Sequence, residues 1–220
     1  MSISFEIRVC QSCGLRYPIA KGHAFGIRCP HCLGETVVAV HKSMDEESRV
    51  RKAPARSLIH PPQQREVGMA VLLDNIRSAW NVGSILRSAD GFGFKHAYLC
   101  GITPTPDQEA VQKTALGAEE YVTWSHHKDA VKLVKGLKKE GWRIWGMEED
   151  GNALEIRNAG IERQKNINTL LIAGSEVTGI DPELLNLCDE IFFIPMQGQK
   201  RSFNVAVAFG VAAYAIMNEG

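Results

Sequence analysis

Four of the six cysteines occur as two Cys-x-x-Cys pairs, Cys10 with Cys13 and Cys29 with Cys32, and fifteen residues separate the pairs. Two thiolates three residues apart in a tight turn can both reach one metal ion at about 2.3 Å, and two such turns complete a tetrahedral site. The spacing matches a known zinc-binding pattern. Because four cysteines leave no open coordination position, the pattern predicts a structural Zn²⁺ ion.

Other uses of these cysteines fit the sequence less well. Disulfides need an oxidising compartment, and a redox Cys-x-x-Cys pair needs no second copy. A metal-dependent enzyme with catalytic cysteines is a third alternative; Cys10→Ser would then abolish chemistry without unfolding the segment, and we expect the reverse. Residues 1–42 are therefore predicted to form a zinc ribbon. Its folding should depend on the metal, because about forty residues bury little core.

A second set of chemically useful residues occupies three segments, 75–87, 174–179 and 194–207, which place small or polar residues directly after apolar runs. In parallel α/β sheets, ligands bind just beyond the carboxyl ends of the strands. Polar groups there must bond to the backbone, to one another or to a ligand. A dinucleotide site is excluded, because no Gly-x-Gly-x-x-Gly follows the first strand.

Elements that would position these segments begin at Gly68. Continuous apolar runs alternate with helical patterns, which is typical of a parallel sheet covered on both faces. The sequence therefore predicts an α/β fold after the ribbon. The predicted strands are 67–75, 95–102, 121–124, 142–147, 169–174 and 190–195, and the predicted helices are 82–89, 128–140 and 204–217.

The 220 residues suffice for one ordinary domain and a small appendage. Residues 43–68 contain charged runs and three prolines, which discourage helix and sheet, so we expect a linker there and a main domain at 69–220. The net charge is zero, but residues 1–68 hold ten Lys/Arg against six Asp/Glu. Contact with phosphates is therefore expected of the N-terminal part, although ordinary surface scatter explains the imbalance equally well.

Localisation signals are lacking in the sequence. No run of eighteen apolar residues occurs, so no contact with membranes is expected. Residues 1–9 lack the apolar core and cleavage site of a signal peptide. A cytoplasmic protein is expected.

Together, the three polar segments resemble the three motifs of the SpoU (TrmH-like) RNA 2′-O-ribose methyltransferases of the SPOUT superfamily. The resemblance covers residues 69–220. It implies a parallel-sheet α/β SPOUT fold with a C-terminal trefoil knot, which is very rare among other folds. It also implies a homodimer that uses S-adenosyl-L-methionine to methylate a ribose 2′-hydroxyl of tRNA or rRNA.

The resemblance assigns roles to residues of each segment. Asn81 and Arg87 match the asparagine and the catalytic arginine of the first motif. Further catalytic residues implied by the second and third motifs are Glu176, Ser202 and Asn204. The positions expected to bind S-adenosyl-L-methionine are Gly174, Gly179, Ile194, Met196, Ser202, Phe203 and Asn204.

The sequence departs from the family pattern at two positions beside the expected donor pocket. Val177 replaces a usual glycine, and Phe203 replaces a common leucine. Pocket shape or donor affinity could differ as a result. Trp80, beside Asn81, is bulkier than expected; it could stack on a base, but packing in the core is slightly favoured.

Arg87 poses a chemical difficulty, because an arginine with a pKa above about 12 is a poor base. We expect it to orient the hydroxyl and stabilise the developing alkoxide, with the proton leaving to phosphate, water or Glu176. Burial and neighbouring cations could instead lower the pKa of Arg87. A structural salt bridge to Asp74 or Asp90 is a further alternative.

The last predicted helix, residues 204–217, is apolar on nearly every face. A helix on the surface of a monomer would show a polar stripe, so this one is expected to pack against a second subunit as well as its own sheet. A catalytically silent RNA-binding protein remains the alternative function. The motif residues Arg87, Glu176, Ser202 and Asn204 argue against it.

Overall fold

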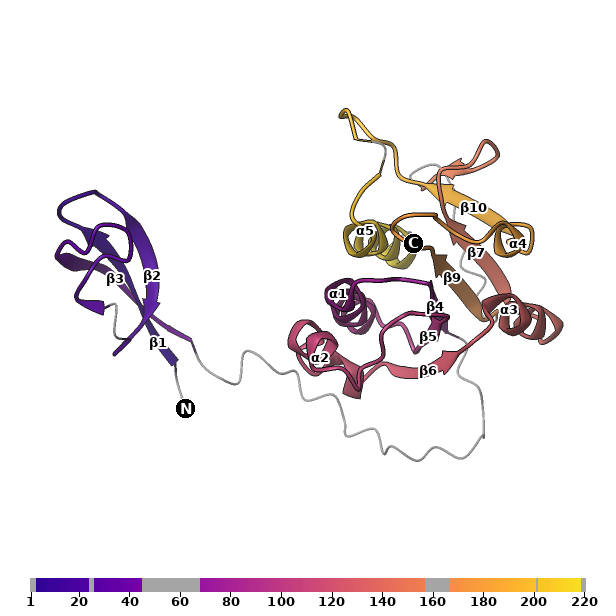
Figure 1. Cartoon of the computed structure of the whole chain (residues 1–220), viewed down its shortest axis with the longest axis horizontal. Coiled ribbons are helices and arrows are strands. Elements are labelled where there is room, and N and C mark those ends of the chain that lie inside the picture. Colours follow the sequence, from indigo (N-terminus) through magenta and orange to yellow (C-terminus); the bar gives the residue numbers. More distant parts are fainter. Residues whose placement is uncertain (1–2, 24–25, 45–67, 157–166, 201, 219–220) are drawn as a thin grey trace. The chain divides into compact units, whose positions relative to one another are not determined.

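The computed structural model describes residues 3–23, 26–44, 68–156, 167–200 and 202–218. The chain divides into two units that are each compact, Met1–Pro61 and Pro62–Gly220 (Figure 1). Most of the predicted linker, residues 43–68, lies outside the described residues. Strand β3 of the first unit runs to Met44, two residues beyond the predicted end of the ribbon.

The first unit is a three-stranded antiparallel sheet in which β1 (Ile3–Cys10) lies between β2 (Arg16–Ala20) and β3 (Thr36–Met44). The end of β1 and the turn that follows it carry one cysteine pair, and the loop before β3 carries the other. Both pairs therefore lie where the chain reverses direction.

The interior of this unit is polar. Its only buried residues among those whose side chains are described are Glu6, Cys10, Cys29 and Thr36. Arg8 forms an ion pair with Glu6, and its Nε donates to Thr36 Oγ1 at 3.0 Å. Removing such charges from water is costly, and no buried aliphatic side chain of the described set offsets the cost. A metal ion would supply the missing stabilisation.

The second unit contains a seven-stranded parallel sheet with the order β6-β5-β4-β9-β7-β10-β8. This arrangement confirms the predicted α/β fold. The carboxyl ends of all the strands lie along one edge of the sheet. The strands are β4 (Met69–Asp74), β5 (His96–Cys100), β6 (Thr123–His127), β7 (Arg143–Met147), β8 (Leu154–Glu155), β9 (Thr169–Ala173) and β10 (Glu190–Phe193).

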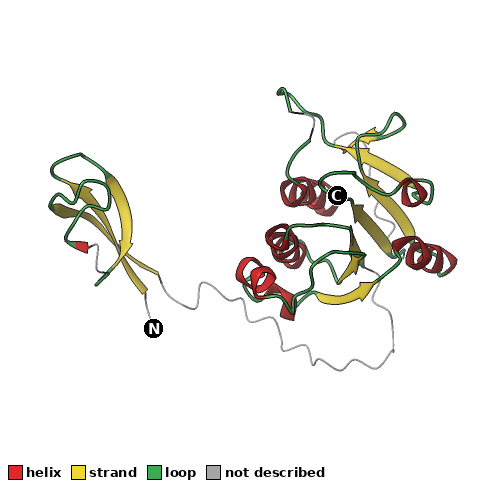
Figure 2. Cartoon of the chain, viewed as in Figure 1, coloured by secondary structure: helices red, strands yellow, loops and turns green. Residues whose placement is uncertain are grey.

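Helices cover both faces of the sheet (Figure 2). Side chains of α1, α2 and α5 pack on one face, and those of α3 and α4 pack on the other. Alternate residues of a strand point to opposite faces, so the interior strand β4, which is covered on both faces, is apolar at every position except its last, Asp74. The helices are α1 (Ala79–Gly91), α2 (Glu109–Ala115), α3 (Ala130–Lys139), α4 (Pro182–Leu185) and α5 (Val205–Asn218), with a 3-10 turn at Ala118–Glu120.

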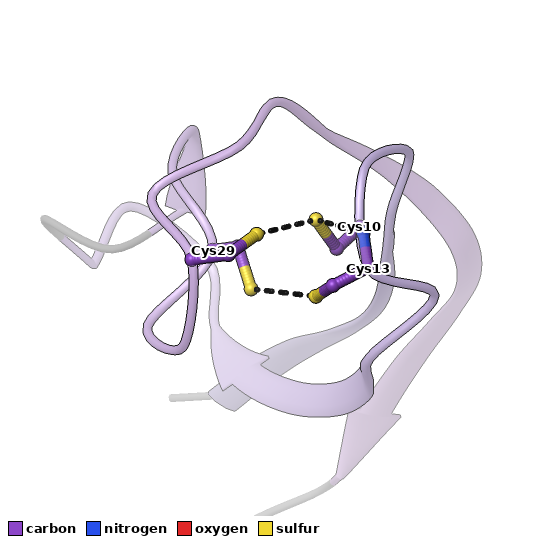
Figure 3. Close-up of side chains that lie close together, drawn as sticks. Cys10, Cys13 and Cys29 are labelled. Carbon is purple, nitrogen blue, oxygen red and sulfur yellow. Dashed lines mark hydrogen bonds between the residues drawn. The ribbon is translucent and has the colours of Figure 1, made fainter.

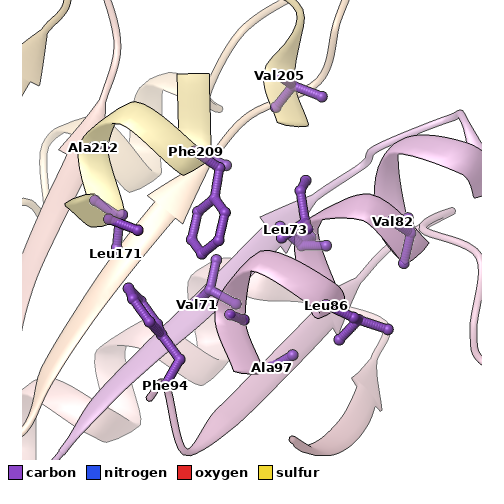
Figure 4. Close-up of a cluster of buried hydrophobic side chains, with 14 of the residues drawn as sticks. Val71, Leu73, Val82, Leu86, Phe94, Ala97, Leu171, Val205, Phe209 and Ala212 are labelled. Atoms are coloured by element: carbon purple, nitrogen blue, oxygen red, sulfur yellow. The ribbon is translucent and has the colours of Figure 1, made fainter. Parts of the chain in front are cut away.

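The core between α1, α5 and the sheet fixes where both helices begin. Val71 and Leu73 of β4 are fully buried beneath Leu86 of α1 and Phe209 of α5 (Figure 4). The rings of Phe94 and Phe209 meet edge to face, with centroids 5.2 Å apart. This packing holds the first turns of α1 and α5 at the carboxyl edge of the sheet.

Gly83 allows α1 to approach α2 closely. A Cβ atom at this position would lie 1.9 Å from Thr114 Oγ1 and 2.4 Å from the carbonyl oxygen of Val111. The glycine of the first motif is therefore explained by helix packing alone.

Several boundaries differ from those predicted. The strand expected at 121–124 is β6, which begins at Thr123, because the N–H groups of Tyr121 and Val122 bond to the carbonyl of Ala118 and continue the 3-10 turn. The helix expected at 128–140 begins only at Ala130, after its N-cap Asp129. Three short elements, α2, α4 and β8, were not predicted from the sequence. No helix of the described residues is long and apolar enough to cross a membrane.

A directional chain of hydrogen bonds joins β5 and β6. Thr123 Oγ1 donates to the carbonyl of Lys95 at 2.8 Å, so it accepts from His96 Nδ1 at 2.7 Å. His96 Nε2 must then accept from Ser125 Oγ, 2.8 Å away. Protonation of His96 Nε2 would remove the acceptor for Ser125 Oγ and disrupt this chain of hydrogen bonds. Burial, aided by the charge of His127, lowers the pKa of His96 to about 4.

This network predicts a stability change in mild acid. The pKa of His96 is about 4 in the folded chain and about 6.5 when unfolded, so stability is complete above pH 6.5 and falls as the pH drops toward 4. We expect a loss of about 2 kcal/mol from this group, allowing for partial solvent screening. Urea unfolding at several pH values should show the loss in the wild type and a smaller one in His96→Gln. Identical pH profiles would contradict the assignment.

Candidate active site and metal site

The four predicted metal ligands come together in the first unit (Figure 3). Their sulfur atoms all lie within 4.8 Å of one another. The Sγ atoms of Cys10 and Cys32 are 3.4 Å apart, and those of Cys13 and Cys29 are 3.7 Å apart. A disulfide needs about 2.05 Å, whereas a tetrahedral zinc site with bonds of about 2.3 Å gives sulfur separations of about 3.8 Å. The geometry therefore fits a metal ion and no disulfide.

Backbone groups prepare these cysteines to bind a cation. The N–H groups of Ser12 and Cys13 both point to Cys10 Sγ at 3.4 Å, and the N–H of His31 points to Cys29 Sγ at 3.4 Å. The N–H of Cys13 has the largest effect and, with that of Ser12, lowers the pKa of Cys10 to about 6 despite burial. Thiolates are the form that binds metal.

A cavity of about 650 Å³ opens at the carboxyl edge of the sheet in the second unit, beside β7, β9, β10 and the start of α5. Its volume lies in the range of small-molecule sites. All seven residues predicted to bind the methyl donor line it, and so does Glu176. The other lining residues include Met147, Glu148, Glu149, Phe192 and Phe193.

The loop after β9 forms one wall of the cavity and is tightly folded. Ser175 and Gly179 exchange two backbone hydrogen bonds, of 3.0 and 2.9 Å. A Cβ atom on Gly174 would lie 2.2 Å from the nitrogen of Ile180, so only glycine fits there. Val177, which departs from the family pattern, stands at the tip of the loop with 71% of its surface exposed, where its bulk meets no obstacle.

Glu176 connects this loop to the start of α1. Its Oε2 accepts the backbone N–H of Arg77 at 2.9 Å. Its Oε1 accepts the backbone N–H of Ser78 at 3.3 Å and a side-chain N–H of Asn81 Nδ2 at 2.9 Å. Partial burial opposes ionisation of Glu176, but these donors outweigh it and lower the pKa of the carboxyl. Glu176 is therefore an ionised, fully engaged acceptor.

Asn81 is also hydrogen-bonded to the third motif. Its Oδ1 accepts from Asn204 Nδ2 at 3.1 Å. Asn204 Oδ1 accepts the N–H groups of Ala206 at 3.0 Å and Val207 at 3.4 Å, so the same side chain caps α5. One residue from each motif thus joins a single network beside the cavity.

Arg87 does not join this network. It is exposed on α1, six residues or about 9 Å along the helix axis from Asn81, and it does not line the cavity. It bonds to no described residue, so the structural salt bridge to Asp74 or Asp90 is not formed. Ser202 lines the cavity and is exposed.

The expectation that Trp80 packs in the core is wrong, because 64% of its surface is exposed. The buried face of α1 consists of Val82, Gly83, Ile85, Leu86 and Ala89. Helical spacing places Trp80 on the opposite face, together with Arg87.

The model of the SpoU rRNA Methylase family matches residues 68–214, two thirds of the chain. The chain belongs to the SpoU methylase family. The resemblance inferred from the three motifs is therefore confirmed, and the matched range coincides with the unit that contains the cavity.

Two relatives within this family show how far the similarity extends. The tRNA (guanosine(18)-2'-O)-methyltransferase of Escherichia coli strain K12 is 28% identical over 151 residues, which are 69% of this chain and 63% of that protein. The chain thus spans less than two thirds of that relative. An enzyme of the same name from Thermus thermophilus is 26% identical over 171 residues, which cover 78% of this chain and 84% of that one.

The fold is also shared with solved structures. An AdoMet-bound rRNA methyltransferase from Sinorhizobium meliloti superimposes with a TM-score of 0.63 and 23% identity, covering 72% of this chain and 57% of that one. This likeness confirms the parallel α/β fold of the second unit.

Two carboxylates that hold the loop after β9 were missed by sequence reasoning. Glu148 follows β7 and accepts the N–H of Ile180, and the buried Asp74 ends β4 and accepts the N–H of Asp181. Each directly follows or ends an apolar strand, as Asn75 and Ser175 do. This position was the available signal, but no family motif drew attention to it.

The cysteine geometry predicts that the full chain carries about one zinc ion. Cys10→Ser should lose the ion, as measured by plasma emission spectrometry, and should unfold the first unit, because the described part of that unit lacks buried aliphatic side chains. The amide resonances of the second unit should stay in place. Retention of both metal and fold in Cys10→Ser would contradict the site.

Proposed function

We propose that this protein is an S-adenosyl-L-methionine-dependent RNA methyltransferase that modifies a ribose 2′-hydroxyl of tRNA or rRNA. The observation that carries the proposal is the network of Asn81, Glu176 and Asn204 beside a cavity of about 650 Å³. The family match supports it, as do relatives named as tRNA 2'-O-methyltransferases.

The cavity fits the methyl donor in shape and chemistry. Met147 and Ile194, which are partly exposed in the lining, offer apolar surface for an adenosine. A structural neighbour is described as AdoMet-bound. S-adenosyl-L-methionine supplies a methyl group already activated by the sulfonium. The residues that would hold it are Gly174, Gly179, Ile194, Met196, Ser202, Phe203 and Asn204.

The chain's own residues then have to place the ribose and deal with one proton. Ser202 and Asn204 line the cavity, and Asn81 holds Asn204. Glu176 is a weak proton acceptor, because its pKa is lowered and its oxygens are engaged. The proton is therefore left to solvent, and Arg87 orients the hydroxyl and stabilises the alkoxide.

A homodimer completes the proposal. Val207, Val211 and Tyr214 of α5 recur at helical spacing and are 52%, 41% and 62% exposed, which is a large apolar face for a helix end. A second copy of the chain would cover this face. Arg87 does not line the cavity of its own chain. In the same assembly it can reach an acceptor bound over a cavity.

The remaining assignments follow the family and the composition. The zinc ribbon holds Zn²⁺ through Cys10, Cys13, Cys29 and Cys32 and contributes to RNA binding, since Arg16, Lys21 and Arg28 are exposed on it. The C-terminal part of the second unit forms the trefoil knot of the SPOUT fold. Relatives named as tRNA methyltransferases support a cytoplasmic location.

Arg87→Ala tests the catalytic role. Loss of the group that stabilises the alkoxide should lower methyl transfer from labelled donor to bulk RNA by about 100-fold or more. Donor affinity, measured by calorimetry, should stay within about threefold, because Arg87 does not line the cavity. Lys139→Ala, an exposed cation on α3, should retain activity.

Other results of this experiment would change the role assigned to Arg87 or the function assigned to the chain. Wild-type turnover in Arg87→Ala would remove the residue from the mechanism. A wild-type chain that binds RNA and donor but transfers no methyl group would support the silent RNA-binding alternative.

Val211→Glu tests the dimer. A buried charge at the interface should dissociate the subunits, which sedimentation velocity would detect as a shift from dimer to monomer. Val40→Glu, at a 43% exposed valine of the ribbon, is the matched control and should leave the dimer intact. A monomeric wild type, or a dimer that tolerates Val211→Glu, would refute the α5 interface.

A further inference from the structure

The loop after β9 is held at its exit by the two strands on either side of it. β9 lies between β4 and β7 in the sheet. Asp74 is the last residue of β4, and Glu148 directly follows β7. Both carboxylates reach the backbone of the same loop, from opposite sides.

Glu148 contacts the loop most closely. Its Oε2 accepts the N–H of Ile180 at 2.9 Å, and its Oε1 accepts the N–H of Glu149 at 3.3 Å. A Cβ atom on Gly179, which has a φ of +73°, would lie 2.3 Å from Glu148 Oε2. The carboxylate therefore occupies space that any side chain at position 179 would need.

Asp74 holds the next residue of the loop. It is only 3% exposed, and its Oδ2 accepts the N–H of Asp181 at 3.3 Å. Its Oδ1 accepts from Asn75 Nδ2 at 2.8 Å, which fixes the carboxylate in place. Two consecutive backbone N–H groups are thus bound by carboxylates from the two flanking strands.

The loop held in this way is the wall of the cavity. Residues 174–179 line it, and Gly174 packs against the backbone of Gly179 and Ile180 with no room for a side chain. The tip of the loop is already tied to α1 through Glu176. Without a second attachment at its exit, the loop would be free to pivot about that tip.

We propose that Glu148, assisted by Asp74, is a positioning residue that clamps the exit of the loop 174–180 and so sets the shape of the methyl-donor pocket. The identity of the donor rests on the proposed function, whereas the clamp does not. Glu148 acts through its hydrogen bond to Ile180. A neutral side chain that can accept the same bond should therefore replace it, which a direct charge contact with the ligand would not allow.

Steady-state kinetics of the full chain test this role. Glu148→Ala should raise the KM for S-adenosyl-L-methionine about tenfold, with kcat within about threefold, because it removes an acceptor from a charged hydrogen bond and touches no group of the Asn81 network. Glu148→Gln should stay within about threefold of the wild-type KM. Glu183→Gln, at an exposed carboxylate on the helix after the loop, is the matched control and should leave KM unchanged.

Two kinetic outcomes would overturn the proposal. A KM in Glu148→Gln as high as in Glu148→Ala would show that the negative charge matters, and not the hydrogen bond. An unchanged KM in Glu148→Ala would show that the clamp does not shape the pocket.

Amide hydrogen exchange followed by NMR tests the clamp without any ligand. In Glu148→Ala the N–H of Ile180 should exchange about tenfold faster, while that of Leu171 in β9 reports any loss of global stability. Unchanged exchange at Ile180 would overturn the clamp. If the wild-type chain binds no donor, the proposed function fails, but the exchange data still decide whether Glu148 holds the loop.

Discussion

The carboxylate of Glu176 joins parts of the chain that lie about a hundred residues apart. It accepts two backbone N–H groups from the turn before α1 and the amide of Asn81, which in turn accepts from Asn204. Buried or partly buried polar groups need such partners, and a loop at a strand end has few of its own. The three motifs therefore hold one another in place, and the loss of one would leave its partners in the other two bonded only to water.

The parallel sheet makes this meeting possible. Because all seven strands point the same way, the turn after β4, the loop after β9 and the approach to α5 open on one edge. The apolar core that contains Val71, Leu73 and Phe209 then fixes the starts of α1 and α5 at that edge. The first unit follows a different principle. Its buried residues in the described part are cysteines, Glu6 and Thr36, so metal ligation takes the place of a hydrophobic core.

Features with a strong local signal could be predicted from the sequence. The buried strands are continuous apolar runs, and the four cysteines have metal-ligand spacing, so both were placed correctly within a few residues. The start of β6 was missed because backbone bonds to Ala118 extend a turn through residues that look like a strand. Trp80 was misplaced because an aromatic side chain suits a core as well as a surface. Only the orientation of α1 against the sheet shows that position 80 faces solvent. The role of Glu148 depends on β7 lying beside β9, a pairing that no local pattern specifies.

Arg87 shows how the chemistry is divided among the residues. It is exposed to water and bonds to no described residue, and a guanidinium is a poor base. Glu176 has a lowered pKa and engaged oxygens, so it is no better as a proton acceptor. Neither Arg87 nor Glu176 is therefore suited to act as a general base, and their contribution is to align groups and stabilise negative charge. Since the methyl donor is already activated, alignment is the main task that remains, and solvent can take the proton as the methyl group is transferred.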